Sequence, residues 1–206
     1  MRQASVGKPA LPQEERRDSR GAKRRRKIFR SLHDCILEKG YVKTTLADVA
    51  QGADMSASHL LYYFKGKEDV LEQYFDNLSV RFMEQLDQLS QRDTLARIHG
   101  LTDFWFKGEA STRQEIGFML ECFGAAVNDD VLRVTKAEFD ARCKVFLVEI
   151  FNSAPDIFMR SAKDAAELCY ALMIGLRSAV YFDDDIDLEE AHRLFLSTML
   201  RMCRLD

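Results

Sequence analysis

The stretch Thr44–Glu68 reads TTLADVAQGADMSASHLLYYFKGKE, and it decides the fold of the N-terminal part of the chain. Two short helical patterns, Thr45–Gly52 and Ser56–Tyr63, flank a turn at residues 54–56. Thr45 caps the first helix in a capping-box pattern with Asp48, and a serine caps the second. A short helix braced by its predecessor fits the major groove of B-DNA, so this stretch predicts a helix-turn-helix.

The second short helix begins with small or polar residues, which let a helix approach base edges. Two tyrosines follow with hydroxyls that reach phosphates, and a lysine opens the next helix near its positive dipole end. The basic run at 23–27 adds contacts that release counterions. The residues that we expect to contact DNA are Arg24, Arg25, Thr44, Thr45, Ser56, Ala57, Ser58, His59, Tyr62, Tyr63 and Lys67.

Charge is distributed unevenly along the 206 residues. The whole chain has a formal net charge of −3, which on average argues against a polyanionic partner. Residues 1–27 nevertheless carry ten basic and three acidic side chains, a net charge of +7, whereas residues 76–206 have a net charge of −8. We therefore expect only one end of the protein to contact nucleic acid, with an affinity that falls steeply as salt rises.

Helical periodicity continues on both sides of the helix-turn-helix. The preceding helix should end at Gly40, and only three prolines occur in the chain, two of them in its first dozen residues. The later helices are expected at 67–91, 94–107, 112–127, 130–152, 162–182 and 187–204. The prediction is an all-α fold of about nine helices, with a flexible basic tail at 1–21, a DNA-binding domain at 22–75 and a ligand-binding and dimerisation domain at 76–206.

The C-terminal domain is rich in aromatic and sulfur-containing side chains, which are typical of an apolar binding cavity but also of a well-packed core. One arginine, Arg177, stands in an apolar helical segment, where it could pair with a ligand carboxylate or with an acidic neighbour. The candidate effector-binding residues are Phe104, Trp105, Phe118, Met119, Cys122, Phe146, Met173 and Arg177.

The stretch from Lys27 to Leu71 resembles the TetR family of bacterial transcriptional regulators. The resemblance lies in Gly40-Tyr41, in the pattern TTxxxVAxxA at 44–53, and in YYFxxKE at 62–68. It departs from the family pattern at Asp54, which stands in place of the turn glycine, and it also has Ser58 where glycine is frequent and Leu61 where tyrosine is common. Asp tolerates the positive φ of such a turn better than most residues do.

The resemblance implies a homodimer in which two DNA-binding heads are carried by helical bodies with ligand pockets. It also implies that the last two helices of each chain pair in a four-helix bundle, for which apolar helix faces supply a self-complementary surface. The residues expected at this interface are Leu168, Leu172, Gly175, Ala179, Leu194, Phe195, Thr198, Met199 and Met202.

Other classes of protein find little support. Five widely spaced cysteines without a CxxC pair indicate reduced thiols in a cytoplasmic protein. No stretch reaches 18 apolar residues, so no membrane span is expected. No nucleophile with a base and no metal-ligand spacing is visible, so we expect no enzyme activity, no cofactor and no metal site; the acidic run Asp183–Asp185 is typical of a solvated turn.

The sequence therefore predicts a ligand-responsive repressor that binds a palindromic DNA operator as a dimer and is released by a small apolar or amphipathic effector. An alternative is a helical ligand-binding or adaptor protein whose head has lost DNA-binding activity. Asp54 and Ser58 motivate that alternative.

Overall fold

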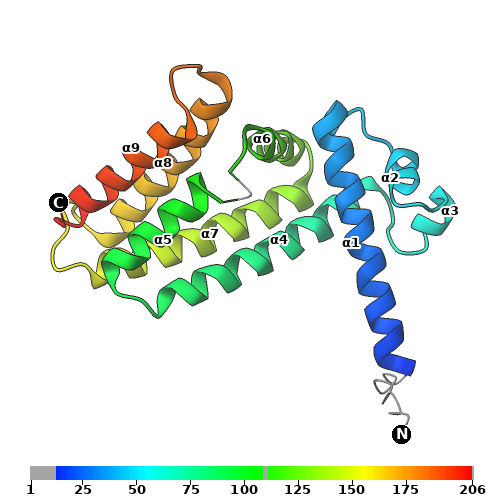
Figure 1. Ribbon diagram of the computed structural model, residues 1–206, viewed down its shortest axis with the longest axis horizontal. Coiled ribbons are helices and arrows are strands. Elements are labelled where there is room, and N and C mark those ends of the chain that lie inside the picture. Colours follow the sequence, from blue (N-terminus) through cyan, green and yellow to red (C-terminus); the bar gives the residue numbers. More distant parts are fainter. Residues whose placement is uncertain (1–12, 109–110, 206) are drawn as a thin grey trace, which may run out of the picture.

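The computed structural model describes residues 13–108 and 111–205, and in these ranges it holds nine helices and no strand (Figure 1). The helices are α1 (Gln13–Lys39), α2 (Leu46–Gly52), α3 (Ala57–Leu60), α4 (Lys67–Ser90), α5 (Thr94–Phe106), α6 (Arg113–Val127), α7 (Asp130–Ser153), α8 (Ala162–Phe182) and α9 (Leu188–Met202). The predicted all-α class, with a helix-turn-helix at the N-terminal end, is confirmed.

Capping side chains set most of the helix boundaries close to the predicted ones. The Thr45 side chain accepts a hydrogen bond from the Asp48 backbone N–H while Asp48 reaches back to the Thr45 backbone, so the capping box is complete. Ser56 caps α3, and side chains of the same kind cap α5 to α9. Gly40 has a φ of 79° and ends α1, because glycine enters the left-handed region without steric cost.

Two boundaries differ from the prediction by more than two residues. The helix α3 ends at Leu60 rather than near Tyr63, because tight turns follow it and bring Phe64 into the core, where it is 2% exposed. The helix α1 begins at Gln13, so residues 13–21 belong to a helix and not to the predicted tail. The remainder of that tail, residues 1–12, lies outside the described residues.

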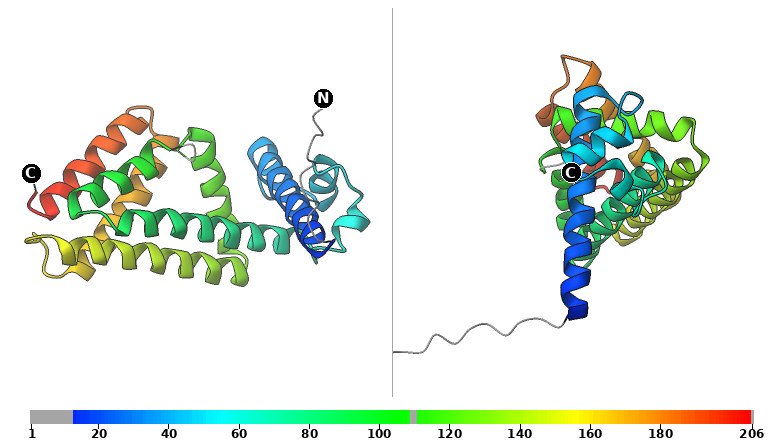
Figure 2. Two further views of the ribbon diagram at one scale, coloured as in Figure 1. Left: turned by 60° about the horizontal axis from the view of Figure 1, so that its bottom comes forward. Right: turned by 90° about the vertical axis from the view of Figure 1, so that its right-hand side faces the viewer.

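The buried apolar side chains form two clusters, one in a head built around α1, α2 and α3 and one in a body built from α5, α7, α8 and α9. Figures 1 and 2 show the head at one end of an elongated body, with α8 and α9 at the other end. The helix α4 belongs to both parts, because Val70 and Leu71 are buried in the head cluster whereas Phe82 and Leu86 are buried in the body cluster. It is therefore a continuous rod that joins the two.

The core of the head includes side chains from α6 and α7. Besides residues of α1 to α4, its cluster contains four buried side chains from later helices. These are Phe118, Cys122, Ala126 and Leu132. The helix α6 thus closes the core of the head, although the predicted domain boundary assigned it to the body.

Candidate functional site

The turn between α2 and α3 is held by close packing and by an ion pair. Gly52 lies so close to α1 that an added Cβ would stand 2.3 Å from Ser31 Oγ, and the Ser31 hydroxyl donates a 2.8 Å hydrogen bond to the Val49 carbonyl oxygen. Asp54 adopts a φ of 53°, as expected for a residue in place of the turn glycine. Its carboxylate pairs with the Lys27 ammonium group of α1, which lowers the pKa of Asp54.

The face of α3 that would enter a DNA groove is exposed to solvent. Ser58 and His59 are exposed, and Tyr62 is 83% exposed, while Leu60 on the opposite side is fully buried. The Tyr63 ring lies beside those of His59 and Tyr62, with centroid distances of 5.6 and 5.3 Å. The structure thus places these predicted contacts on one face, with Ser56 and Ala57 at the start of the same short helix.

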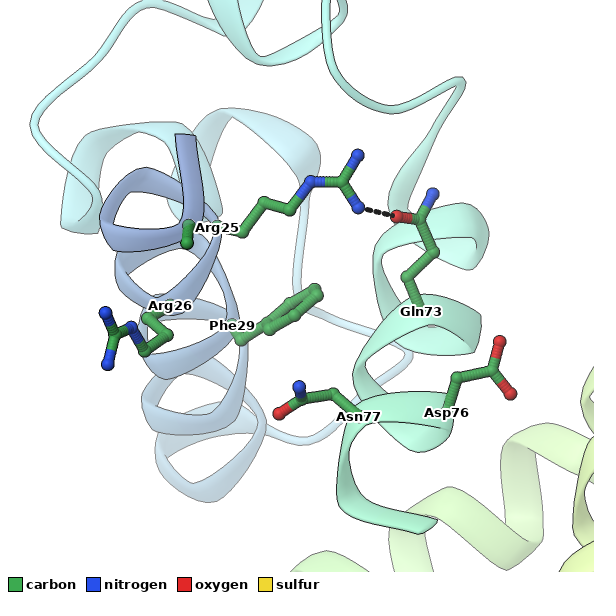
Figure 3. A pocket seen from close by; sticks show the side chains of 7 residues that line it. Arg25, Arg26, Phe29, Gln73, Asp76 and Asn77 are labelled. Atoms are coloured by element: carbon green, nitrogen blue, oxygen red, sulfur yellow. Dashed lines mark hydrogen bonds between the residues drawn. The ribbon is translucent and has the colours of Figure 1, made fainter. Parts of the chain in front are cut away.

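Side chains of the basic run reach from α1 to the neighbouring elements. Arg24 Nη1 donates a 2.9 Å hydrogen bond to the Tyr63 hydroxyl. Arg25 Nη1 donates a 2.7 Å hydrogen bond to Gln73 Oε1 on α4, and both line a hollow of about 400 Å³ between α1 and α4 (Figure 3). These bonds fix the exposed part of α1 against both the helix-turn-helix and α4.

Two predicted DNA contacts stand apart from the exposed face. Thr44 is 1% exposed, and its hydroxyl donates to the Gly40 carbonyl oxygen 2.9 Å away, so it supports the loop before α2 instead of facing solvent. Lys67 is half-buried; its Nζ donates a 3.0 Å hydrogen bond to the Tyr41 carbonyl oxygen and lies 4.2 Å from the centre of the Tyr41 ring. The ammonium group of Lys67 is therefore already engaged within the head. Thr45, in contrast to these two residues, is exposed.

A polar joint connects the head to α6, and no pattern in the sequence predicts it. An imidazole nitrogen of His33 lies 3.0 Å from Glu115 Oε2, and the Tyr41 backbone N–H donates a 2.9 Å hydrogen bond to Glu121 Oε2. The hydrogen bond with Glu115 raises the pKa of His33 above 6.5, although burial opposes it. These pairs are about 80 residues apart in sequence, so no local pattern could have indicated them.

An aromatic cluster, defined as Phe82, Phe104, Trp105 and Phe139, lies at the junction of α4, α5 and α7, with Phe82 and Trp105 buried and Phe104 and Phe139 half-buried. The centroid of the Phe82 ring stands 4.8, 5.1 and 5.0 Å from those of Phe104, Trp105 and Phe139. The Arg177 guanidinium, on α8, lies 5.3 Å from the centre of the Trp105 ring, and Nη1 donates a 2.5 Å hydrogen bond to the Trp105 carbonyl oxygen. Burial lowers the pKa of Arg177 to about 10, so it stays charged at neutral pH.

The predicted effector-binding residues do not all gather at one place. Phe146 and Met173 are buried in the body core with Trp105, and Met119 packs against it. Phe118 and Cys122 instead belong to the head cluster, because the face of α6 that carries them turns toward α1. A second hollow, of about 410 Å³, lies between α4 and α5 and has Phe104 in its wall.

The predicted dimer surface is also divided. On α8, Leu168 is 54% exposed and Gly175 is exposed, with open space where a Cβ would be, while Leu172 and Ala179 are half-buried. On α9, Leu194, Thr198 and Met202 are likewise half-buried.

Phe195 and Met199 are fully buried within the single chain, so the prediction that they face a partner is wrong. The Phe195 ring packs against Phe106 of α5 with centroids 5.5 Å apart, because α9 is apolar on the side that covers α5.

The helix α8 is long and apolar enough to cross a membrane by length and composition alone, and one side of it packs against α7 and α9.

The exposed face of α3, the basic surface of α1 and the helical body together define a DNA-binding regulator of the helix-turn-helix class. The protein-family model described as bacterial regulatory proteins, tetR family, matches residues 28–74. The model of the BetI-type transcriptional repressor C-terminal domain matches residues 94–204. The chain belongs to the TetR family of transcriptional regulators, which are DNA-binding proteins and not enzymes.

Solved structures share this fold at low sequence identity. A TetR-family transcriptional regulator from Rhodococcus sp. is 19% identical, with a TM-score of 0.74 over 88% of this chain and 99% of its own. A regulator from Saccharomonospora viridis in complex with choline is 18% identical, with a TM-score of 0.76 and coverage of 87% and 96%. The SmeT–triclosan complex is 21% identical, with a TM-score of 0.73 and coverage of 86% and 90%. No curated protein matches the chain by sequence.

Proposed function

We propose that the protein is a cytoplasmic repressor that binds a palindromic operator as a homodimer and leaves it when a small apolar or amphipathic effector enters the body. The observation that carries this proposal is the exposed face of α3, with Ser58, His59 and Tyr62, beside the basic residues of α1. In a two-fold dimer, two such faces would enter successive major grooves about 34–36 Å apart.

The exposed apolar side of α8 supports the dimer. Leu168 and Phe182 are 54% and 71% exposed in the single chain, and the smaller Gly175 and Ala179 lie between them on the helix. A helix from a second copy could approach closely at the small residues and bury the larger ones, which is how an isologous helical interface is built. The same contact would remove the apolar side of α8 from water.

The rod α4 supports a route from effector to DNA. Phe82, near its body end, is the centre of the aromatic cluster, while Val70 and Leu71 at its other end are buried in the head. An effector among the aromatic rings would displace Phe82 and tilt α4, and the head would follow. The joint of α6 with α1 would make the two parts move in concert, and the equilibrium would shift by the difference in effector affinity between the two states.

The test is a DNase footprint on the fragment upstream of the protein's own gene, with and without effector. Choline and triclosan, the ligands of the two solved relatives, are the first compounds to compare, followed by aromatic and aliphatic carboxylates. The expected result is a footprint with two-fold symmetry that one of these compounds abolishes. Absence of a footprint on any genomic fragment at low salt would overturn the repressor proposal.

The alternative hypothesis is that the head has lost its DNA-binding activity. The turn at Asp54, which motivated that hypothesis, does not support it. Asp54 adopts the left-handed conformation and pairs with Lys27, and α2 and α3 both form. The salt dependence of binding to a non-specific duplex separates the two functions, because a head that does not bind DNA gives a flat slope.

A further inference from the structure

The helix α6 packs against the head on one side and against α8 on the other. Figures 1 and 2 show it between α1 and the C-terminal end of α8. On the head side, Glu115 Oε2 lies 3.0 Å from a ring nitrogen of His33, and Glu121 accepts a hydrogen bond from the Tyr41 backbone N–H. The head is therefore connected to the body at two places, through the rod α4 and through α6.

One tyrosine of α8 makes the contact on the body side. An added Cβ at Gly117 would stand 2.7 Å from Tyr181 Cε2, so the ring lies directly against the α6 backbone, where glycine leaves room for it. Arg113, about one turn earlier, donates a 2.8 Å hydrogen bond from Nη2 to the Tyr181 carbonyl oxygen. Its guanidinium carbon lies 5.8 Å from the centre of the Tyr181 ring. We call Arg113, Gly117 and Tyr181 the α6–α8 clamp.

The α6–α8 clamp lies next to the surface proposed for the dimer. Tyr181 is half-buried, and its ring stands 4.9 Å, between centroids, from the ring of the adjacent Phe182, which is 71% exposed. A partner chain that covers Phe182 would thus contact α8 one residue away from the clamp. Contacts between residues therefore run without a break from the proposed dimer surface, through Tyr181 and α6, to the head.

We propose that Tyr181 is a positioning residue: through α6 it fixes the orientation of each head relative to the two-fold axis of the dimer, and so the separation of the two half-sites that the dimer accepts. Each base pair added between half-sites moves them about 3.4 Å apart and turns them about 34–36° around the duplex axis. A head attached only through α4 could rotate about that rod, and the second attachment through α6 prevents the rotation. This inference rests on the proposed dimer and palindromic operator.

The test fills the free space at Gly117 and compares that variant with a change elsewhere on the same helix. Gly117→Ala places a methyl group 2.7 Å from the Tyr181 ring, whereas carbon atoms in contact stand about 3.5–4.0 Å apart, so the ring or α6 must shift by about 1 Å. Gly124→Ala is the matched control, because an added Cβ there meets no described atom of another element within 4 Å. Both substitutions raise the helix propensity of α6. Circular dichroism and sedimentation velocity check the fold and the dimer.

The probes are duplexes built from the half-site that the wild-type protein selects from a random library. One duplex carries a single half-site, and the others carry two inverted half-sites whose separation is varied by one base pair at a time. Fluorescence anisotropy at one salt concentration measures binding. The readout is the ratio of palindrome affinity to single-half-site affinity at each separation, because a fault within α3 lowers both affinities together.

In Gly117→Ala, the ratio at the wild-type separation should fall at least about tenfold, because misplaced heads must deform the duplex to bind both half-sites. The affinity for the single half-site should stay as in the wild type, and Gly124→Ala should match the wild type at every separation. Tyr181→Ala removes the ring from the clamp and should make the dimer accept neighbouring separations almost equally. In that background, Gly117→Ala should have no further effect on the ratio.

An unchanged ratio in Gly117→Ala or in Tyr181→Ala would overturn the proposal. An equal fall in Gly124→Ala, or a full effect of Gly117→Ala in the absence of the Tyr181 ring, would overturn it as well. If Gly117→Ala does not fold, the range of separations accepted by Tyr181→Ala decides alone. If the wild type selects no palindrome, the proposed function fails instead, so the two failures are distinct.

Discussion

The polar joint between His33 and Glu115 gives the protein a stability that depends on pH. The imidazole lies 3.0 Å from the Glu115 carboxylate and 3.6 Å from that of Asp34, and the His33 side chain is 15% exposed. The other groups packed against it are the rings of Tyr74 and Phe118. The hydrogen bond with Glu115 is the main cause of the raised pKa of His33; burial opposes it, and the charges of Glu115 and Asp34 add to it.

A raised pKa in the folded state means that folding favours the protonated imidazole. The resulting stability is fully present below about pH 6.5, the ordinary pKa of histidine, and is lost as the pH rises through the folded-state pKa. A hydrogen bond to a charged group contributes about 1.5–3 kcal/mol, and the 30% exposure of Glu115 favours the lower end. For a chain of this size, about 1.5 kcal/mol corresponds to a change in Tm of about 3–6 °C.

Substitution of His33 by glutamine keeps a hydrogen-bond donor but removes the ionisable group. We expect His33→Gln to melt about 3–6 °C below the wild type at about pH 5.5 and the difference to shrink at alkaline pH. Thermal melts followed by circular dichroism at one protein concentration measure this, and Glu115→Gln should reproduce the loss. Melting curves of wild type and variant that stay parallel across the pH range would refute the reasoning.

Three further predictions concern the DNA-binding face and the dimer. Asp54→Asn removes the partner of Lys27 but keeps a side chain that tolerates positive φ, so duplex binding measured by anisotropy should tighten and the salt slope should steepen by about one per head; an unchanged slope would show that Lys27 reaches no phosphate. Alanine at Ser58 or His59 should alter the consensus selected from random duplexes more than the overall affinity, and an identical consensus would remove both from base recognition. Leu168→Glu places a charge on the apolar side of α8 and should yield monomers in sedimentation velocity, whereas a persistent dimer would exclude this face as the interface.

The sequence was sufficient to predict all of the helices and most of their boundaries, because those boundaries are encoded locally; the start of α1 and the end of α3 are the exceptions. Thr45 with Asp48, Ser56 and Gly40 each act within three or four residues, and the structure bears out their predicted roles. Asp54 was also predictable, since the turn demands a positive φ whichever residue occupies it. The exposed positions of α3 followed from the same local pattern.

The residues that the structure separates from their predicted groups depend on which neighbour a helix face meets, and periodicity does not contain that information. Phe118 and Cys122 have the spacing of a buried helix face, but that face packs against the head and not around the aromatic cluster. Phe195 and Met199 lie on an apolar side of α9 that covers α5, so they are unavailable to a partner. Thr44 is polar and near the turn, yet its hydroxyl is used within the chain.

The contribution of α6 and α7 to the core of the head limits how this protein can be divided and recombined. A fragment that ends at residue 75 would lack Phe118, Cys122, Ala126 and Leu132, and would expose the apolar surface that they cover. Grafting this head onto the effector domain of another regulator therefore requires that the α6 face be transplanted with it. Exchange of operator specificity between relatives is then easier by substitutions on α3 than by exchange of whole domains.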